Sequence, residues 1–86
     1  MIVLEYYSDA EVHQKMREVG FLIAYHRRKK GLSQAKLAEA AGISRQHLAA
    51  VEAAGMLRPF SVEFLIKIAG VLEVSPAEFF GFGEKS

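Results

Sequence analysis

The stretch Gly42–Gly55, GISRQHLAAVEAAG, places four polar side chains in a row, from Ser44 to His47. A serine hydroxyl paired with an imidazole can act in nucleophilic catalysis, and histidine is a common metal ligand. Both chemistries need further groups, and the chain has a single aspartate, no cysteine, and two other histidines, His13 and His26, too far apart for a local ligand pair. The sequence therefore favours neither an enzyme nor a metal site, and it indicates no cofactor.

Most of the serines have a different role, because five of the six stand directly before a stretch of helical character. A serine at this position caps the helix, since its hydroxyl accepts a hydrogen bond from a backbone N–H of the first turn. These serines are Ser8, Ser33, Ser44, Ser61 and Ser75. Ser8 with Glu11, and Ser75 with Glu78, also fit the reciprocal capping box. We therefore predict five helices, each beginning after a serine.

The apolar residues between these caps repeat with helical spacing. The first helix reaches Lys30, and Gly20 is a weak point at which it bends or restarts. The other helices are predicted at about 33–41, 44–53, 61–73 and 75–80. The inward face of the first helix is expected to contain Val12, Met16, Val19, Leu22, Ile23 and Tyr25. That of the fourth is expected to contain Val62, Leu65, Ile66, Ala69 and Leu72.

The second and third helices are joined only by the sequence AGI, so they must cross closely, as in a helix-turn-helix. Leu37 and Leu48 are expected to face each other, with the small Ala38 where the helices approach. Gly42 allows a positive φ in the turn, and Val51 closes the core. The sequence predicts an all-α fold in one domain, residues 1–86, with a helix-turn-helix at 33–53 and a short extended segment at 1–8.

The charge is unevenly distributed along the chain. Nine basic and three acidic residues lie between Lys15 and Arg58, whereas both flanking segments are net negative and the whole chain is only +1. Such segregation suits a polyanion such as nucleic acid. Four of these cations form the run RRKK at a predicted helix C-terminus, where they also interact favourably with the helix dipole.

From about Phe21 to Phe80 the chain resembles the phage repressor and Cro-like family of helix-turn-helix regulators, also called the xenobiotic-response-element family. The resemblance lies in KKGLSQAKLAEAAGISRQHLAAVE and FLIKIAGVLEVSPAEFF. It implies a lambda-repressor-like fold of five helices, in which the second helix bridges the DNA backbone and the third enters the major groove. The implied function is a sequence-specific, double-stranded DNA-binding transcriptional regulator that acts by operator occupancy.

The resemblance also implies roles for individual side chains. Arg45 and Gln46 match the base-contacting positions, and they have suitable chemistry, because arginine can pair bidentately with guanine and glutamine with adenine. Arg27 and Glu52 match a structural ion pair between the first and third helices. Gln34 matches a phosphate anchor. Further contacts to the DNA backbone are expected from Ser33, Lys36, Ser44, His47 and Arg58, although His47 fits a surface residue without a role equally well.

Two features depart from the family pattern. The third helix carries Ala50 and Ala53 where the family often has another polar base-contacting residue, and the loop that follows keeps one charge, Arg58. Fewer phosphate contacts imply weaker binding with a shallower salt dependence. The alternative is a protein-interaction module or antitoxin-like protein, with Met56 and Leu57 as exposed apolar contacts. A restriction-control regulator is also compatible with the sequence.

Family resemblance further implies a homodimer, which places two recognition helices in successive major grooves. Both chain ends carry more apolar side chains than a small core is expected to bury. Apolar residues alternate along the N-terminal segment, which is able to pair antiparallel with the same segment of a second copy. The alternative is that both ends fold back over their own helices. The expected dimer contacts are Ile2, Leu4, Tyr6, Phe79, Phe80 and Phe82.

The composition of the chain indicates the cellular compartment in which the protein works. A chain of 86 residues with 51 % apolar composition can form one small core, and the lack of cysteine favours a reducing cytoplasm. The early run MIVLEYY is too short for a membrane helix and lacks the basic flank of a signal peptide. We expect a cytoplasmic protein without membrane contact, and no small-molecule ligand is evident.

Overall fold

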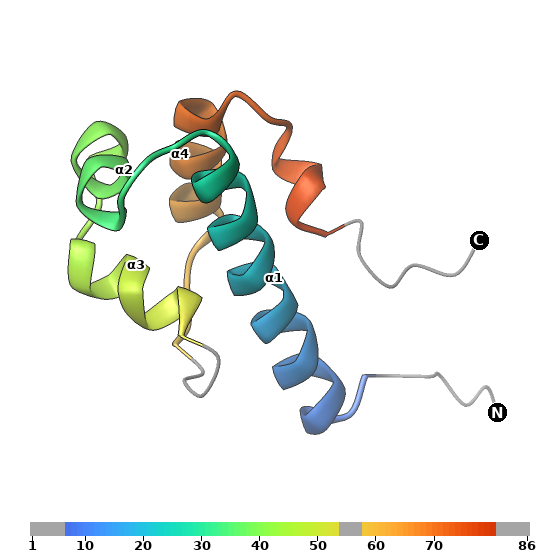
Figure 1. Cartoon of the computed structure of the whole chain (residues 1–86). Coiled ribbons are helices and arrows are strands. Elements are labelled where there is room, and N and C mark those ends of the chain that lie inside the picture. Colours follow the sequence, from blue (N-terminus) through green and yellow to red (C-terminus); the bar gives the residue numbers. More distant parts are fainter. Residues whose placement is uncertain (1–6, 54–57, 81–86) are drawn as a thin grey trace, which may run out of the picture.

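The computed structural model describes residues 7–53 and 58–80, which contain four α-helices and one short 3-10 helix (Figure 1). The predicted all-α class is confirmed. The predictions at Ile2, Leu4, Tyr6, Met56, Leu57 and Phe82 lie outside the described residues. The elements are α1 (Asp9–Lys29), α2 (Gln34–Ala41), α3 (Arg45–Glu52), α4 (Val62–Leu72) and η1 (Pro76–Phe79).

All five predicted serine caps are present. Each hydroxyl accepts a backbone N–H of the first turn, and Ser8 and Glu11 complete a capping box, with the Ser8 N–H donating to the Glu11 carboxylate at 2.7 Å. The second predicted capping box is wrong, because the Ser75 hydroxyl accepts from Ala77 rather than Glu78. A fifth α-helix is likewise wrong: η1 is one tight turn, in which the Glu78 N–H bonds the Ser75 carbonyl oxygen, three residues back.

Gly20 does not interrupt α1, which runs unbroken for 21 residues. The prediction of a bend was wrong because this glycine serves packing instead. A Cβ atom built on Gly20 would overlap the carbonyl oxygen of Val51, at the end of α3. The missing side chain therefore allows the backbones of α1 and α3 to touch.

The core lies where α1, α2, α3 and α4 converge, and it contains the predicted pair Leu37 and Leu48, both fully buried. Ala38 and Val51 are also buried, and Gly42 has a φ of 69°, as the helix-turn-helix prediction required. The helix-turn-helix at the centre of the fold thus has the buried contacts and the backbone conformation that the sequence predicted.

Part of the predicted inward faces is wrong. Val62 and Ile66 are 71 % and 53 % exposed, because α4 buries a stripe that includes Phe64 and Ile68. The helix is apolar on most of its circumference, so spacing alone does not select the face. On α1, Val12 and Tyr25 are also exposed.

Phe79 is fully buried, where η1 packs against α1 and α4. Its ring meets that of His26 edge-on, with centroids 6.0 Å apart. The prediction that Phe79 is a surface dimer contact is therefore wrong, whereas its neighbour Phe80 is 53 % exposed. In the described part of the chain, no helix combines the length and apolar character needed to cross a membrane.

Candidate nucleic-acid interface

The turn between α2 and α3 determines how the two helices cross. Gly42 ends α2 in the left-handed conformation, and the N–H of Ile43 donates to the carbonyl oxygen of Ala38 at 3.0 Å. The chain then reverses into the Ser44 cap of α3. Figure 1 shows α2 and α3 together on one side of the molecule, with η1 on the other. This arrangement exposes the first turns of both helices.

Arg45 and Gln46 form the exposed start of α3. Within the described segments, neither side chain has an ion pair or an intramolecular hydrogen bond. Leu48 and Val51, on the same helix, are buried in the core. The helix is therefore fixed by one face, while its N-terminal polar side chains remain available for a ligand.

His47 differs from these two neighbours. Its Nε2 atom lies 2.8 Å from the carbonyl oxygen of Pro59, and its ring packs on Phe64 with centroids 4.6 Å apart. Phe60 stacks on Phe64 in turn. His47 therefore connects α3 to the segment that precedes α4, and one of its two ring nitrogens is already engaged.

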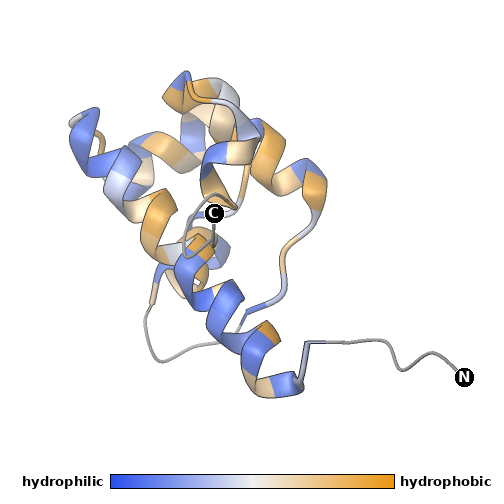
Figure 2. Cartoon of the chain, turned by 90° about the vertical axis from the view of Figure 1, so that its right-hand side faces the viewer, coloured by the Kyte–Doolittle hydropathy of each residue, from blue (hydrophilic) through white to orange (hydrophobic). Residues whose placement is uncertain are grey.

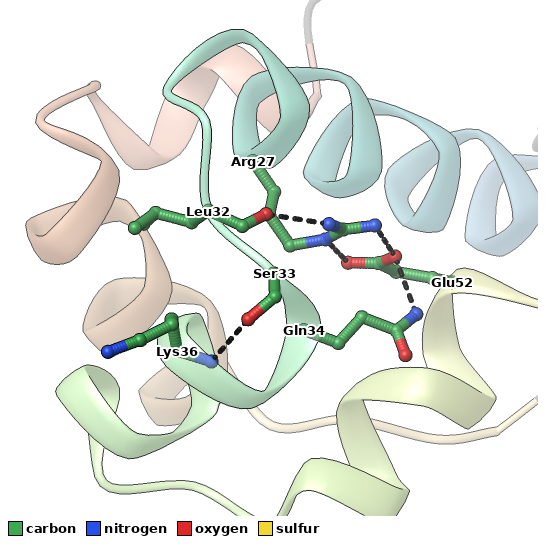
Figure 3. Close-up of polar contacts among 6 residues, drawn as sticks. All are labelled: Arg27, Leu32, Ser33, Gln34, Lys36 and Glu52. Carbon is green, nitrogen blue, oxygen red and sulfur yellow. Dashed lines mark hydrogen bonds and ion pairs between the residues drawn. The ribbon is translucent and has the colours of Figure 1, made fainter.

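The N-terminus of α2 carries three predicted contact residues. The Ser33 hydroxyl accepts the Lys36 N–H at 3.0 Å, and the Lys36 side chain is exposed with no ion pair among the described residues. The Gln34 side chain points the other way, and its Nε2 atom donates to Glu52 Oε1 at 3.0 Å (Figure 3). The structure thus links the first residue of α2 to the last residue of α3.

Arg27 and Glu52 form a bidentate ion pair between α1 and α3. Arg27 Nε and Nη2 donate to the two carboxylate oxygens, both at 2.9 Å, and Nη1 donates to the carbonyl oxygen of Leu32 at 2.8 Å. The Arg27 and Glu52 side chains are only 9 % and 3 % exposed. Paired and hydrogen-bonded on all sides, these charges hold the two helices together.

A contribution from α4 was missed in the sequence. A hollow of about 200 Å³ lies between the starts of α3 and α4. It is lined by the cap Ser61 with Glu63 and Lys67 of α4, and by the cap Ser44 with His47 of α3. Glu63 and Lys67 form an ion pair at 3.2 Å. The cap at Ser61 was visible in the sequence, but its position beside α3 depends on the long-range packing of α4. Arg58 is exposed near the start of this segment.

The basic run at the end of α1 is less available than its sequence suggests. Arg27 is paired with Glu52, and Lys30 Nζ lies 2.8 Å from Glu73 Oε1. The hydrogen bond from Lys30, together with its charge, lowers the pKa of the Glu73 carboxyl below its ordinary value. Arg28 and Lys29 are exposed. In the part of the chain that the structure describes, no group of three or more potential ligands could hold a metal ion.

Comparison with known proteins agrees with this geometry. A helix-turn-helix family model matches residues 23–79, well over half of the chain. The chain belongs to the Cro/C1-type helix-turn-helix family. The resemblance inferred from the sequence is therefore confirmed, and the match ends at Phe79, the buried residue of η1.

Among curated members of this helix-turn-helix family, the HTH-type transcriptional regulator SinR of Bacillus subtilis (strain 168) is 39 % identical over 57 residues, covering 66 % of this chain and 50 % of SinR. The chain thus spans about half the length of the curated relatives it matches.

Two solved structures are also similar. The restriction-modification controller protein C.AhdI from Aeromonas hydrophila superimposes with a TM-score of 0.72 at 31 % identity, covering 78 % of this chain and 98 % of C.AhdI. SinR in complex with DNA gives a TM-score of 0.66 at 35 % identity, covering 72 % of this chain and 97 % of that chain.

Proposed function

We propose that this chain binds double-stranded DNA with sequence preference and regulates transcription by occupying an operator. The observation that carries this proposal is the exposed pair Arg45 and Gln46 at the start of a helix whose other face is buried. The relative SinR is named a transcriptional regulator, and one similar structure of SinR contains DNA. In this proposal the chain acts in the cytoplasm, and occupying an operator requires no reaction step.

In this proposal Arg45 and Gln46 read base edges, guanine and adenine respectively, in the major groove. The hydroxyl of Ser33 or Ser44 accepts a capping N–H and still has its own hydrogen to donate to a phosphate oxygen. Gln34, Lys36 and Arg58 supply further backbone contacts. His47 acts through its bond to Pro59, which holds the neighbouring Arg58 beside α3.

The experiment is a titration of labelled genomic fragments at low and moderate salt. Arg45→Ala is expected to cost about 1–3 kcal/mol and to relax preference at one base pair, whereas Gln34→Ala weakens all duplexes nearly equally. Gln14→Ala, on the exposed first half of α1, is the matched control and leaves binding unchanged.

Binding of every fragment at the level of random duplex would contradict the proposal. The protein-interaction alternative would then gain support from a pull-down partner that is lost in Leu57→Asp.

We also propose that the working unit is a homodimer, because one recognition helix with two base-reading side chains discriminates weakly. An apolar hollow of about 410 Å³ supports this, since Tyr7, Val12 and Phe80 line it and all three are exposed. The proposed dimer contacts also include Ile2, Leu4, Tyr6 and Phe82.

Sedimentation equilibrium tests the dimer. Phe80→Asp is expected to give a monomer, while Ile66→Asp, at a position equally exposed on α4, leaves the association unchanged. A parent protein that stays monomeric even on operator DNA would refute the proposal.

A further inference from the structure

The Glu52 carboxylate makes more contacts than its ion pair with Arg27 requires. It accepts two hydrogen bonds from Arg27 and a third, at 3.0 Å, from the Gln34 amide (Figure 3). A carboxylate can only accept, so the Gln34 nitrogen faces Glu52. The last residue of α3 therefore holds the side chain of the first residue of α2.

This hold fixes the orientation of the Gln34 amide. With one N–H bound to Glu52, the amide plane is set, and its second N–H and its oxygen have defined directions. A free glutamine side chain has about 1.5–2 kcal/mol of rotamer entropy to lose when it binds a ligand. Gln34 has lost part of that freedom before DNA arrives, which favours the contact through preorganisation.

The position of Glu52 is itself fixed by α1. The contact between Gly20 and the Val51 carbonyl places the α3 backbone directly on α1, and the Glu52 Cα lies 3.5 Å from the position of a Cβ on Gly20. Arg27, from the same helix, then holds the carboxylate. The buried end of α3 thus acts as a rigid support for Gln34.

We propose that Glu52 is a positioning residue for the DNA-backbone contact of Gln34, in addition to its role in the ion pair. This inference rests on the proposed function. It predicts that the acceptor at position 52 contributes to DNA affinity, and that it does so only when Gln34 is present.

The variants must avoid stranding a buried charge, which would threaten folding. The double variant Arg27→Met with Glu52→Met removes both charges and the acceptor. Its matched control is Arg27→Met with Glu52→Gln, in which the amide oxygen at position 52 can still accept the Gln34 N–H. Both double variants are then made again with Gln34→Ala added. Thermal melting checks that all four proteins are folded.

The probe is a labelled duplex of random sequence, because a contact to the DNA backbone needs no operator. We expect the variant with Glu52→Met to bind about 3- to 10-fold more weakly than the control with Glu52→Gln, the effect of one hydrogen bond. With Gln34→Ala added, the difference disappears. The slope of log affinity against log salt is the same for the Glu52→Met variant and the Glu52→Gln control, because a neutral amide releases no counterion.

Three outcomes would overturn the positioning role of Glu52. They are a difference in affinity that persists after Gln34→Ala, no difference in affinity at all, and a smaller salt slope in the Glu52→Met variant. Each of these outcomes requires that the parent protein binds the duplex. A parent that does not bind refutes the proposed function itself, and this inference with it, so the two failures are distinguishable.

Discussion

Backbone conformation and charge act in opposite directions at Glu73. This residue ends α4 with a φ of 60°, in the left-handed region that disfavours side chains with a Cβ. Its carboxylate also pairs with Lys30 at 2.8 Å, on the molecular surface. Exposed ion pairs contribute little, so the backbone strain is the larger effect.

We therefore expect Glu73→Gly to raise the thermal midpoint at neutral pH. Lys30 lowers the pKa of Glu73, so the ion pair stabilises the fold at pH values above the ordinary glutamate pKa. This stabilisation is lost as the pH falls through the lowered pKa. The gain from glycine should then increase in acid. Thermal melts across this range measure it.

Lys30→Met provides the control for this experiment, since in that background the gain should no longer depend on pH. A lower midpoint for Glu73→Gly at neutral pH would show that the ion pair outweighs the strain.

Individual residues also show where sequence reasoning succeeds. Gly42 was predictable, because a glycine between two short helices indicates a positive φ. Glu73 was not, because nothing in its side chain indicates that conformation. The partners of Glu52 differ in the same way. Its ion pair with Arg27 was inferred from family resemblance, whereas the hydrogen bond from Gln34 depends on how α2 and α3 cross.

At the scale of the elements, the serine caps were predictable because each depends on residues within three positions. The buried face of α4 was not, because the helix is apolar nearly all round and its neighbours select the face. Gly20 was misread for a related reason: a glycine inside a helix marks either a weak point or a close contact, and only the position of α3 decides.

The close contact predicts opposite effects of alanine at two helical glycines. Gly20→Ala forces α1 and α3 apart and should destabilise the protein by about 1–3 kcal/mol. Gly70→Ala, inside α4 with open space where a Cβ would lie, should stabilise it by about 0.5–1 kcal/mol. Denaturant unfolding measures both. Equal effects of the two substitutions would contradict the packing role of Gly20.

At the scale of the whole molecule, summing charges along the chain overstated the free positive charge, because Arg27 and Lys30 are paired with residues 25 and 43 positions away. The candidate site was predictable where it depends on residues adjacent in sequence, such as Arg45 and Gln46. It was not predictable where α4 approaches α3. Folding therefore neutralises part of the basic segment, while Lys36 and Arg45 stay exposed at the starts of α2 and α3.

This distribution makes the salt dependence of DNA binding a test of position. Lys36→Gln, at the start of α2, should reduce the slope of log affinity against log salt by about 1, because one phosphate contact is lost. Lys15→Gln removes the same charge from α1, beside the apolar hollow, and should leave the slope unchanged. An equal change of the salt slope in both variants would mean that DNA does not bind specifically on the side of α2 and α3.

The unbroken α1 also divides into two parts of different stability. None of its residues from Asp9 to Glu18 is buried, whereas Val19, Ile23 and Arg27 are, and in Figure 2 the first turns project beyond the other helices. Amide hydrogens in the first part should exchange with solvent through local fraying, and those from Ile23 to Arg27 only through global unfolding. Native-state hydrogen exchange would then show, within one continuous helix, a sharp rise in protection near Gly20, and uniform protection along α1 would contradict this division.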